Sequence, residues 1–167
     1  MTVPIIGIDP GSRFTGYGII TGNNSQPEAI HFGRIVVAGH TVAEKLYDIF
    51  SKLQDIIHTY QPGEFAIEQV FFHRNAQSAL KLGQARGAAL TAAAACALPV
   101  SEYSPKQIKQ AVVGYGGAEK SQVQHMVRAL LRLKSTPDVD AADALAIALC
   151  HCHTRHLART LSNNLSI

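Results

Sequence analysis

Short apolar runs separated by turn residues dominate the first 40 residues of the chain and predict three β-strands. The runs cover residues 3–9, 15–21 and 28–38, and the segments between them carry the Pro, Gly, Ser and Asn residues that are typical of turns. Because the connections are short, we expect these three strands to pair antiparallel.

Beyond residue 40 the apolar positions recur with helical spacing, and capping residues mark where helices begin. Thr41 followed by Glu44 forms a capping box at the start of an amphipathic helix. Asn75 and Ser104 are expected to cap two further helices, the second with Pro105 at its first position. The other expected elements are strands at 64–69 and 100–103, and helices ending near 133 and 156.

This order of elements indicates an α/β fold in which a five-stranded mixed sheet is flanked by helices. Residues 3–9 would form a central strand beside residues 64–69, joined by a helical crossover and therefore parallel. Residues that end these two strands would then lie at the same edge of the sheet.

The length and composition fit one globular domain. The chain has 167 residues, of which 47% are hydrophobic, and no long low-complexity tract. We expect the domain to span residues 1–158 and residues 159–167 to form a disordered tail. No signal-peptide pattern or membrane-spanning run is visible. The chain has three cysteines, an odd number that does not suit a disulfide framework. These features favour a cytoplasmic protein with free thiols and no membrane association.

Positive charge is concentrated in the middle of the chain. The net charge is only +3, yet residues 69–134 hold nine Lys or Arg against two acids, whereas the rest holds six against ten. Basic side chains spaced along ordered elements suit a surface that meets phosphates, although each could equally lie on a solvated helix face. Among them, Arg74 and Lys81 are candidate DNA contacts.

Four acids occur within or at the end of apolar runs, where an ionised side chain is costly unless a cation compensates it. Asp9 and Glu68 end predicted strands, and Asp140 and Asp143 lie one helical turn apart. Each has an ordinary alternative: a turn aspartate, an edge-strand glutamate, or an acid at a helix start. We assign that capping role to Asp138.

An all-oxygen set of this kind selects Mg²⁺, or Mn²⁺ in its place, over zinc. Two such ions, roughly 3.5 to 4 Å apart, could activate a water and stabilise the leaving oxygen of a phosphodiester. The sequence therefore predicts a two-metal phosphodiesterase site formed by Asp9, Glu68, Asp140 and Asp143.

Four segments carry a specific resemblance. Residues 5–20, 65–87, 116–131 and 140–153 resemble the RuvC family of Holliday junction resolvases, over nearly the whole chain. The resemblance implies an RNase H-like fold, in which Asp9, Glu68, Asp140 and Asp143 bind the catalytic metals. It also implies that Lys109 and Lys120 contact DNA near the cut and that Phe71 acts at the junction crossover. Some members have histidine at the position of Asp140.

The same resemblance implies a biological role. Paired nicks in strands of like polarity would resolve a four-way DNA junction and leave 5′-phosphate and 3′-hydroxyl ends, in recombination and repair. A homodimer would match the two-fold symmetry of the junction. Gly83, Gly87 and Thr91 share a stripe of one helix that could form its interface or pack on its own sheet. RuvA and RuvB are the implied partners.

Other functions fit the sequence less well. Glu119 occupies the position where a P-loop requires glycine, and an actin-like ATPase needs a second lobe. The Cys and His residues at 150–156 point in different directions on a helix, so we assign them no zinc. A non-catalytic junction-binding module and a related nuclease that acts on RNA remain open.

Overall fold

Each predicted strand and helix is present in the computed structural model, which describes residues 2–70 and 75–164. Within these residues the chain forms five strands and five helices. The strands are β1 (Ile5–Asp9), β2 (Phe14–Gly22), β3 (Pro27–Val36), β4 (Glu64–Glu68) and β5 (Val100–Tyr103). The helices are α1 (Val42–Tyr60), α2 (Ala76–Ala95), α3 (Pro105–Val113), α4 (Lys120–Leu130) and α5 (Val139–Asn164).

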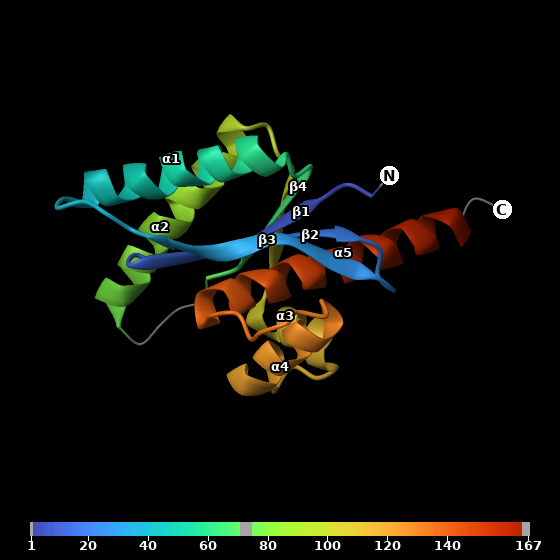
Figure 1. The fold of residues 1–167 in the computed structure, drawn as a ribbon. Coiled ribbons are helices and arrows are strands. Elements are labelled where there is room, and N and C mark those ends of the chain that lie inside the picture. The colour runs from blue at the N-terminus through green and yellow to red at the C-terminus, as the bar shows by residue number, and fades with distance from the viewer. Residues whose placement is uncertain (1, 71–74, 165–167) are drawn as a thin grey trace.

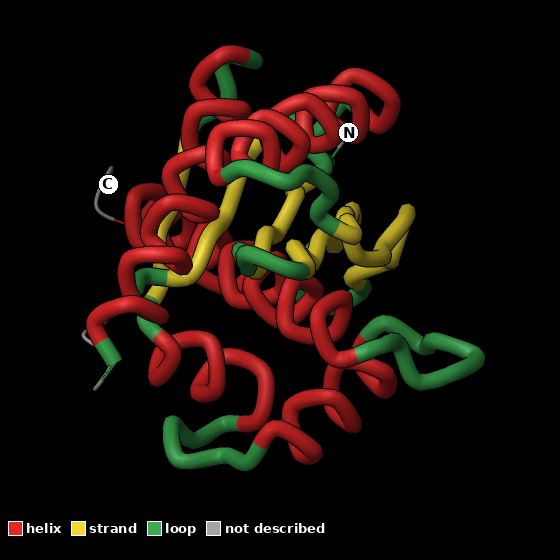
Figure 2. The backbone as a smooth tube through the Cα atoms, turned by 90° about the vertical axis from the view of Figure 1, so that its left-hand side faces the viewer, coloured by secondary structure: helices red, strands yellow, loops and turns green. Residues whose placement is uncertain are grey.

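The strands form one mixed sheet in the order β3-β2-β1-β4-β5. The first three strands pair antiparallel, whereas β1 with β4 and β4 with β5 pair parallel. The prediction of a central first strand beside β4 is therefore confirmed. Helices α1 and α2 cover one face of the sheet and α3, α4 and α5 lie on the other (Figure 1), and the view turned by 90° again shows helices on both sides of the strands (Figure 2).

Alternation along β1 and β4 divides the core into two layers. Ile6, Ile8, Phe65 and Ile67 are buried with residues of α1 and α2. Ile5 and Ala66, one position away, are buried with residues of α3, α4 and α5. Because successive strand residues point to opposite faces, Asp9 and Glu68 lie on the α5 face of the sheet.

The predicted caps are formed. Thr41 and Glu44 make a reciprocal capping box on α1, and Ser104 makes one with Gln107 on α3. The Asn75 side chain accepts hydrogen bonds from two backbone amides of the first turn of α2. Asp138 accepts one from the amide of Ala141 at 2.9 Å, which confirms its predicted role at the start of α5.

Glycines on the sheet allow α5 to approach the strand backbones closely. A Cβ added at Gly7 would overlap the carbonyl oxygen of Ala144 and lie 2.7 Å from the amide nitrogen of Ala148. A Cβ at Gly18, paired with Gly7 across β1 and β2, would lie 2.7 Å from the side chain of Leu145 and 2.9 Å from its amide nitrogen. The helix that carries two of the candidate acids is thus held directly against the central strands.

We therefore expect Gly7→Ala to destabilise the protein by about 3 kcal/mol, because backbone rather than a flexible side chain fills the space. Urea unfolding followed by circular dichroism measures this loss. Gly117→Ala is the matched control, since a Cβ there would meet only Tyr115 at an ordinary 3.7 Å. Equal stability of the two variants would contradict the close packing of α5.

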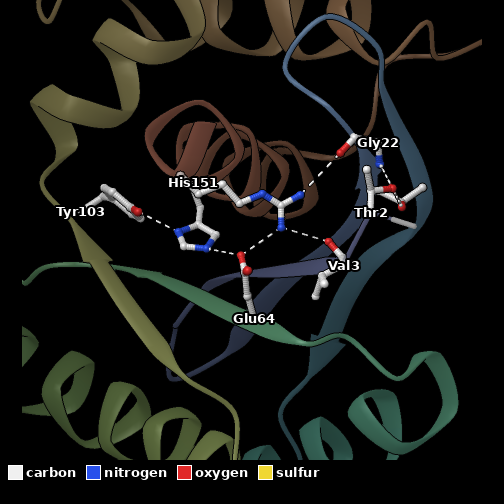
Figure 3. Close-up of polar contacts among 8 residues, drawn as sticks. Thr2, Val3, Gly22, Glu64, Tyr103 and His151 are labelled. Carbon is white, nitrogen blue, oxygen red and sulfur yellow. Dashed lines mark hydrogen bonds and ion pairs between the residues drawn. The ribbon is translucent and has the colours of Figure 1, made fainter. Parts of the chain in front are cut away.

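A partly buried polar network also ties α5 to the sheet (Figure 3). His151 bonds the hydroxyl of Tyr103 and the carboxylate of Glu64, both at 2.7 Å. Arg155 donates to the same carboxylate at 3.0 Å and to the carbonyl of Val3 at 3.0 Å. Burial lowers the pKa of His151. This network gives His151, one of the three histidines in residues 150–156, a structural role.

Helix α5 is longer than predicted. The sequence analysis ends it at 156 and expects a disordered tail from residue 159, but the helix continues to Asn164. The predicted end of this helix at 156 is therefore wrong, because residues 157–164 contain neither proline nor glycine and nothing in them breaks a helix. The domain boundary at residue 158 and the disordered tail stay predictions. Within the described part of the chain, no helix has the length and apolarity needed to cross a bilayer.

Candidate active site

Asp9 and Glu68 meet at one edge of the sheet because their strands are parallel neighbours. Ile8 pairs with Ile67, and each acid is the next residue of its strand. The adjacent strands are about 4.8 Å apart, so two distant parts of the sequence place their carboxylates side by side on the α5 face. This convergence was predicted from the sequence.

The first turns of α5 bring the other two acids to the same place. Gly16 pairs with Asp9 across β1 and β2, and a Cβ at Gly16 would overlap the carbonyl oxygen of Asp140. The helix backbone therefore rests on the strand immediately beside Asp9. Asp143 follows one turn later and is half-buried.

The electrostatics show that the acids act on one another. The pKa of Asp9 is raised to about 7, first by burial and then by the charges of Asp143, Glu68 and Asp140. Burial also raises the pKa of Asp143, more than Lys120 lowers it. The carboxylates of such a cluster repel one another, and a bound cation would reduce this repulsion.

Two basic side chains partly compensate the negative charge of the acids. The Nζ of Lys120 lies 3.3 Å from Asp143, and the pKa of this lysine is raised by the aspartate. A guanidinium nitrogen of Arg34, on β3, lies 3.6 Å from Asp140. Lys120 begins α4 after the glycine-rich turn, as predicted, whereas no local feature of the sequence singled out Arg34.

Three of the four acids line a hollow of about 260 Å³. Its polar walls are Asp9, Glu68, Asp143, Lys109 and Lys120, and α3, α4 and α5 supply the apolar remainder. Lys109 and Lys120 thus lie beside the acids, where the resemblance placed them. Asp140 is not among the residues that line this hollow, and its carboxylate lies instead on the side of Arg34.

The chemistry of the donor set suits a hard divalent cation. Four carboxylates supply only oxygen ligands, the type preferred by Mg²⁺ and Mn²⁺. In residues 2–70 and 75–164 as they stand, no three His, Cys, Asp or Glu side chains form a metal-binding group. Asp143 pairs with Lys120 and Asp140 pairs with Arg34, so each of these two acids already has a positively charged partner.

The remaining predicted contacts fall elsewhere. Lys81 lies with Arg13 and Lys45 in a separate hollow between the β1–β2 turn and the helices α1 and α2. Phe71 and Arg74 lie outside the described residues, so their predicted roles stay predictions.

Arg86 has a role that its sequence context did not indicate. It donates from Nε to the carbonyl of Glu68 at 3.2 Å and pairs with Glu102, and so it fixes the end of β4. The sequence reveals only that Arg86 is basic, because both contacts come from the packing of α2 on the sheet.

Comparison with known proteins gives a consistent result. The family model described as crossover junction endodeoxyribonuclease RuvC matches residues 5–151. The chain is 60% identical over 157 residues to the RuvC of Coxiella burnetii (strain Dugway 5J108-111), covering 94% of this chain and 91% of that one. It is 59% identical over 155 residues to the RuvC of Idiomarina loihiensis, covering 90% and 87%.

Solved structures agree with this match. A structure of Thermus thermophilus RuvC is 35% identical, with a TM-score of 0.84. One of T. thermophilus RuvC in complex with Holliday junction substrate is 34% identical, with a TM-score of 0.88. Each comparison covers 93% of this chain and 96% of the other.

The sheet order and its two helical layers, shared with these structures, define an α/β protein of the RNase H-like class. Within that class, the extent of the family match and the identities near 60% decide the assignment. The chain belongs to the RuvC family of crossover junction endodeoxyribonucleases, which confirms the resemblance found in the sequence.

Proposed function

We propose that this protein is a Mg²⁺-dependent endonuclease that resolves Holliday junctions. It makes paired, symmetric nicks in strands of like polarity and leaves 5′-phosphate and 3′-hydroxyl ends that a ligase can seal. The observation that carries the proposal is the mutual approach of Asp9, Glu68, Asp140 and Asp143 beside two lysines, in a chain of the RuvC family.

In this proposal the four carboxylates are metal ligands and act as catalytic residues through the ions that they hold. Two Mg²⁺ ions held there, for which Mn²⁺ could substitute, would supply an activated water and charge stabilisation at the leaving 3′ oxygen. The carboxylates fix where the charge lies, and the hollow limits access of bulk water. Lys120 and Lys109, at its wall, attract and orient the scissile phosphate.

Lys120 can exchange partners when DNA binds. Its side chain is 76% exposed while it pairs with Asp143, so it can turn to a phosphate without losing packing. The departure of Lys120 leaves Asp143 free to bind a cation. DNA binding and metal binding would therefore support each other.

A homodimer would present two such sites to one junction. The predicted stripe of Gly83, Gly87 and Thr91 lies exposed on α2, where a Cβ at either glycine would meet open space. Tyr47 and Leu80, which are 69% and 63% exposed, add apolar side chains to this surface. Small residues bordered by exposed apolar side chains suit close contact with a symmetry-related copy.

We expect Gly87→Arg to weaken dimerisation roughly 30-fold or more, because a long charged side chain would enter the centre of the interface. Sedimentation velocity measures the dissociation constant. His58→Arg, exposed near the end of α1, is the control. If Gly87→Arg dimerises as well as the wild type does, α2 is not the interface.

RuvA and RuvB are the proposed branch-migration partners, in recombination and repair of chromosomal DNA in the cytoplasm. The test of the proposed function uses the wild-type protein and a synthetic mobile four-way junction, with and without Mg²⁺. Denaturing gels should show nicks at symmetric positions in two opposed strands, only with Mg²⁺, and products that ligase seals. Binding without nicking would indicate a non-catalytic junction-binding module. Preferential cutting of structured RNA would indicate a nuclease of different specificity.

A further inference from the structure

Arg34 belongs to the same row of residues across the sheet as Asp9. It pairs with Gly16 across β2 and β3, and Gly16 pairs with Asp9 across β1 and β2. Residues paired directly across antiparallel strands share a face, so both side chains lie on the α5 face. The intervening Gly16 has no side chain, and the backbone of Asp140 occupies the gap.

Two contacts hold the guanidinium group of Arg34. Its Nη1 lies 3.6 Å from the Oδ2 of Asp140, and its Cζ lies 4.4 Å from the centre of the Phe14 ring. Phe14 is two residues before Gly16 on β2, and therefore on the same face. A cation over an aromatic face is stabilised there, so Arg34 is retained near Asp140 even though 44% of its side chain is exposed.

We propose that Arg34 is an internal counter-ion that competes with the divalent cation for Asp140. This inference rests on the proposed function, because it concerns the metal site of that reaction. Arg34 is a positioning residue: it holds the Asp140 carboxylate on the β3 side, away from the hollow that Asp9, Glu68 and Asp143 line. Metal binding then requires Asp140 to leave Arg34.

The guanidinium group of Arg34 brings a positive charge to the carboxylate of Asp140. Arg34 therefore opposes a second positive charge at Asp140 until one of the two moves. Lys120 differs from Arg34 because it is 76% exposed and pairs only with Asp143 among the described residues. Arg34 contacts both the carboxylate of Asp140 and the ring of Phe14. Lys120 would therefore leave its acid when DNA binds, whereas Arg34 lowers the affinity of the site for a divalent cation whether or not DNA is present.

The test measures binding of Mn²⁺ alone, without DNA, from the electron paramagnetic resonance signal of the free ion. Arg34→Gln should bind Mn²⁺ about three- to tenfold more tightly than the wild type, as expected for removing one charge several ångströms from a divalent ion near a protein surface. Phe14→Leu should shift affinity in the same direction by less, because Arg34 remains but is held less firmly. A purely structural role would instead weaken binding in both variants.

Arg13→Gln is the matched control. Arg13 lies over the same ring, with its Cζ 5.9 Å from the centre, and among the described residues it forms no ion pair with Asp140. It should leave Mn²⁺ affinity unchanged. Thermal melting verifies that each variant is folded.

The outcomes separate the two proposals. If the wild type binds no Mn²⁺, or if Asp9→Asn binds as much Mn²⁺ as the wild type does, the metal site of the proposed function is wrong. If the wild type binds Mn²⁺ at that site, but neither Arg34→Gln nor Phe14→Leu binds it more tightly, the competition by Arg34 is refuted and the proposed function stands. Equal tightening in Arg13→Gln would show a general charge effect and also overturn the inference.

Discussion

Asp9→Asn is expected to reduce junction cleavage by about 10³-fold or more while junction binding stays within about threefold of the wild type. The substitution keeps the shape of the side chain but removes the charge at the centre of the acid cluster, where burial and then the other three acids raise the pKa of Asp9. A ligand that supports metal catalysis contributes several kcal/mol to the transition state, and each 1.4 kcal/mol is about tenfold in rate. Single-turnover cleavage and gel-shift assays on the same junction measure the two quantities.

Asp55→Asn makes the same chemical change at an exposed position on α1 and serves as the control. It should cleave like the wild type. Substantial cleavage by Asp9→Asn under saturating Mg²⁺ would show that this carboxylate is not a metal ligand. Loss of binding together with cleavage would point to a folding defect, which circular dichroism would detect.

The second large effect concerns stability in the absence of metal. The pKa of Asp9 is about 7 in the folded protein, against 3.8 as its ordinary value. The folded state therefore holds this proton more tightly than the unfolded state does, and the associated stability is lost as pH rises from about 4 through about 7. We expect Asp9→Asn to avoid this loss and to be about 2 to 4 kcal/mol more stable than the wild type at pH 8.

Urea unfolding in the presence of a chelator, at pH 8 and at pH 4.5, measures the difference. At pH 4.5 the gap should shrink to about a quarter of its size at pH 8, because Asp9 is then protonated in the folded wild type while most of the unfolded chains have lost this proton. Saturating Mg²⁺ at pH 8 should narrow it as well, since a ligand that binds the folded state stabilises the wild type. An equal difference at both pH values would contradict the charge cluster as its cause.

Local signals in the sequence were sufficient to predict the strands and helices and to predict that Asp9 and Glu68 lie close together. The Thr41–Glu44 box and Asn75 marked helix starts through contacts within one turn. The parallel pairing of β1 with β4 follows from the helical crossover between them, so the two strand ends had to share an edge. These features depend on short-range chemistry and on general rules of connection.

The contacts of Arg34 and Arg86 could not be predicted in the same way. Arg34 reaches Asp140 only because β2 and β3 pair in one register, which shifts between Ile19 and Ile20. A one-residue slip would turn Arg34 to the other face. Arg86 reaches Glu68 because α2 packs at a particular height on the sheet. Both contacts depend on tertiary packing that no local pattern encodes.

The most direct test of the account is to locate Mn²⁺ by anomalous scattering in crystals of the protein bound to an uncleaved junction. The account predicts two ions roughly 3.5 to 4 Å apart, ligated by oxygens of Asp9, Glu68, Asp140 and Asp143, with Arg34 no longer paired to Asp140. Ions bound elsewhere, or a site in which Asp140 stays on Arg34 and Asp143 on Lys120 while the DNA is in place, would contradict it.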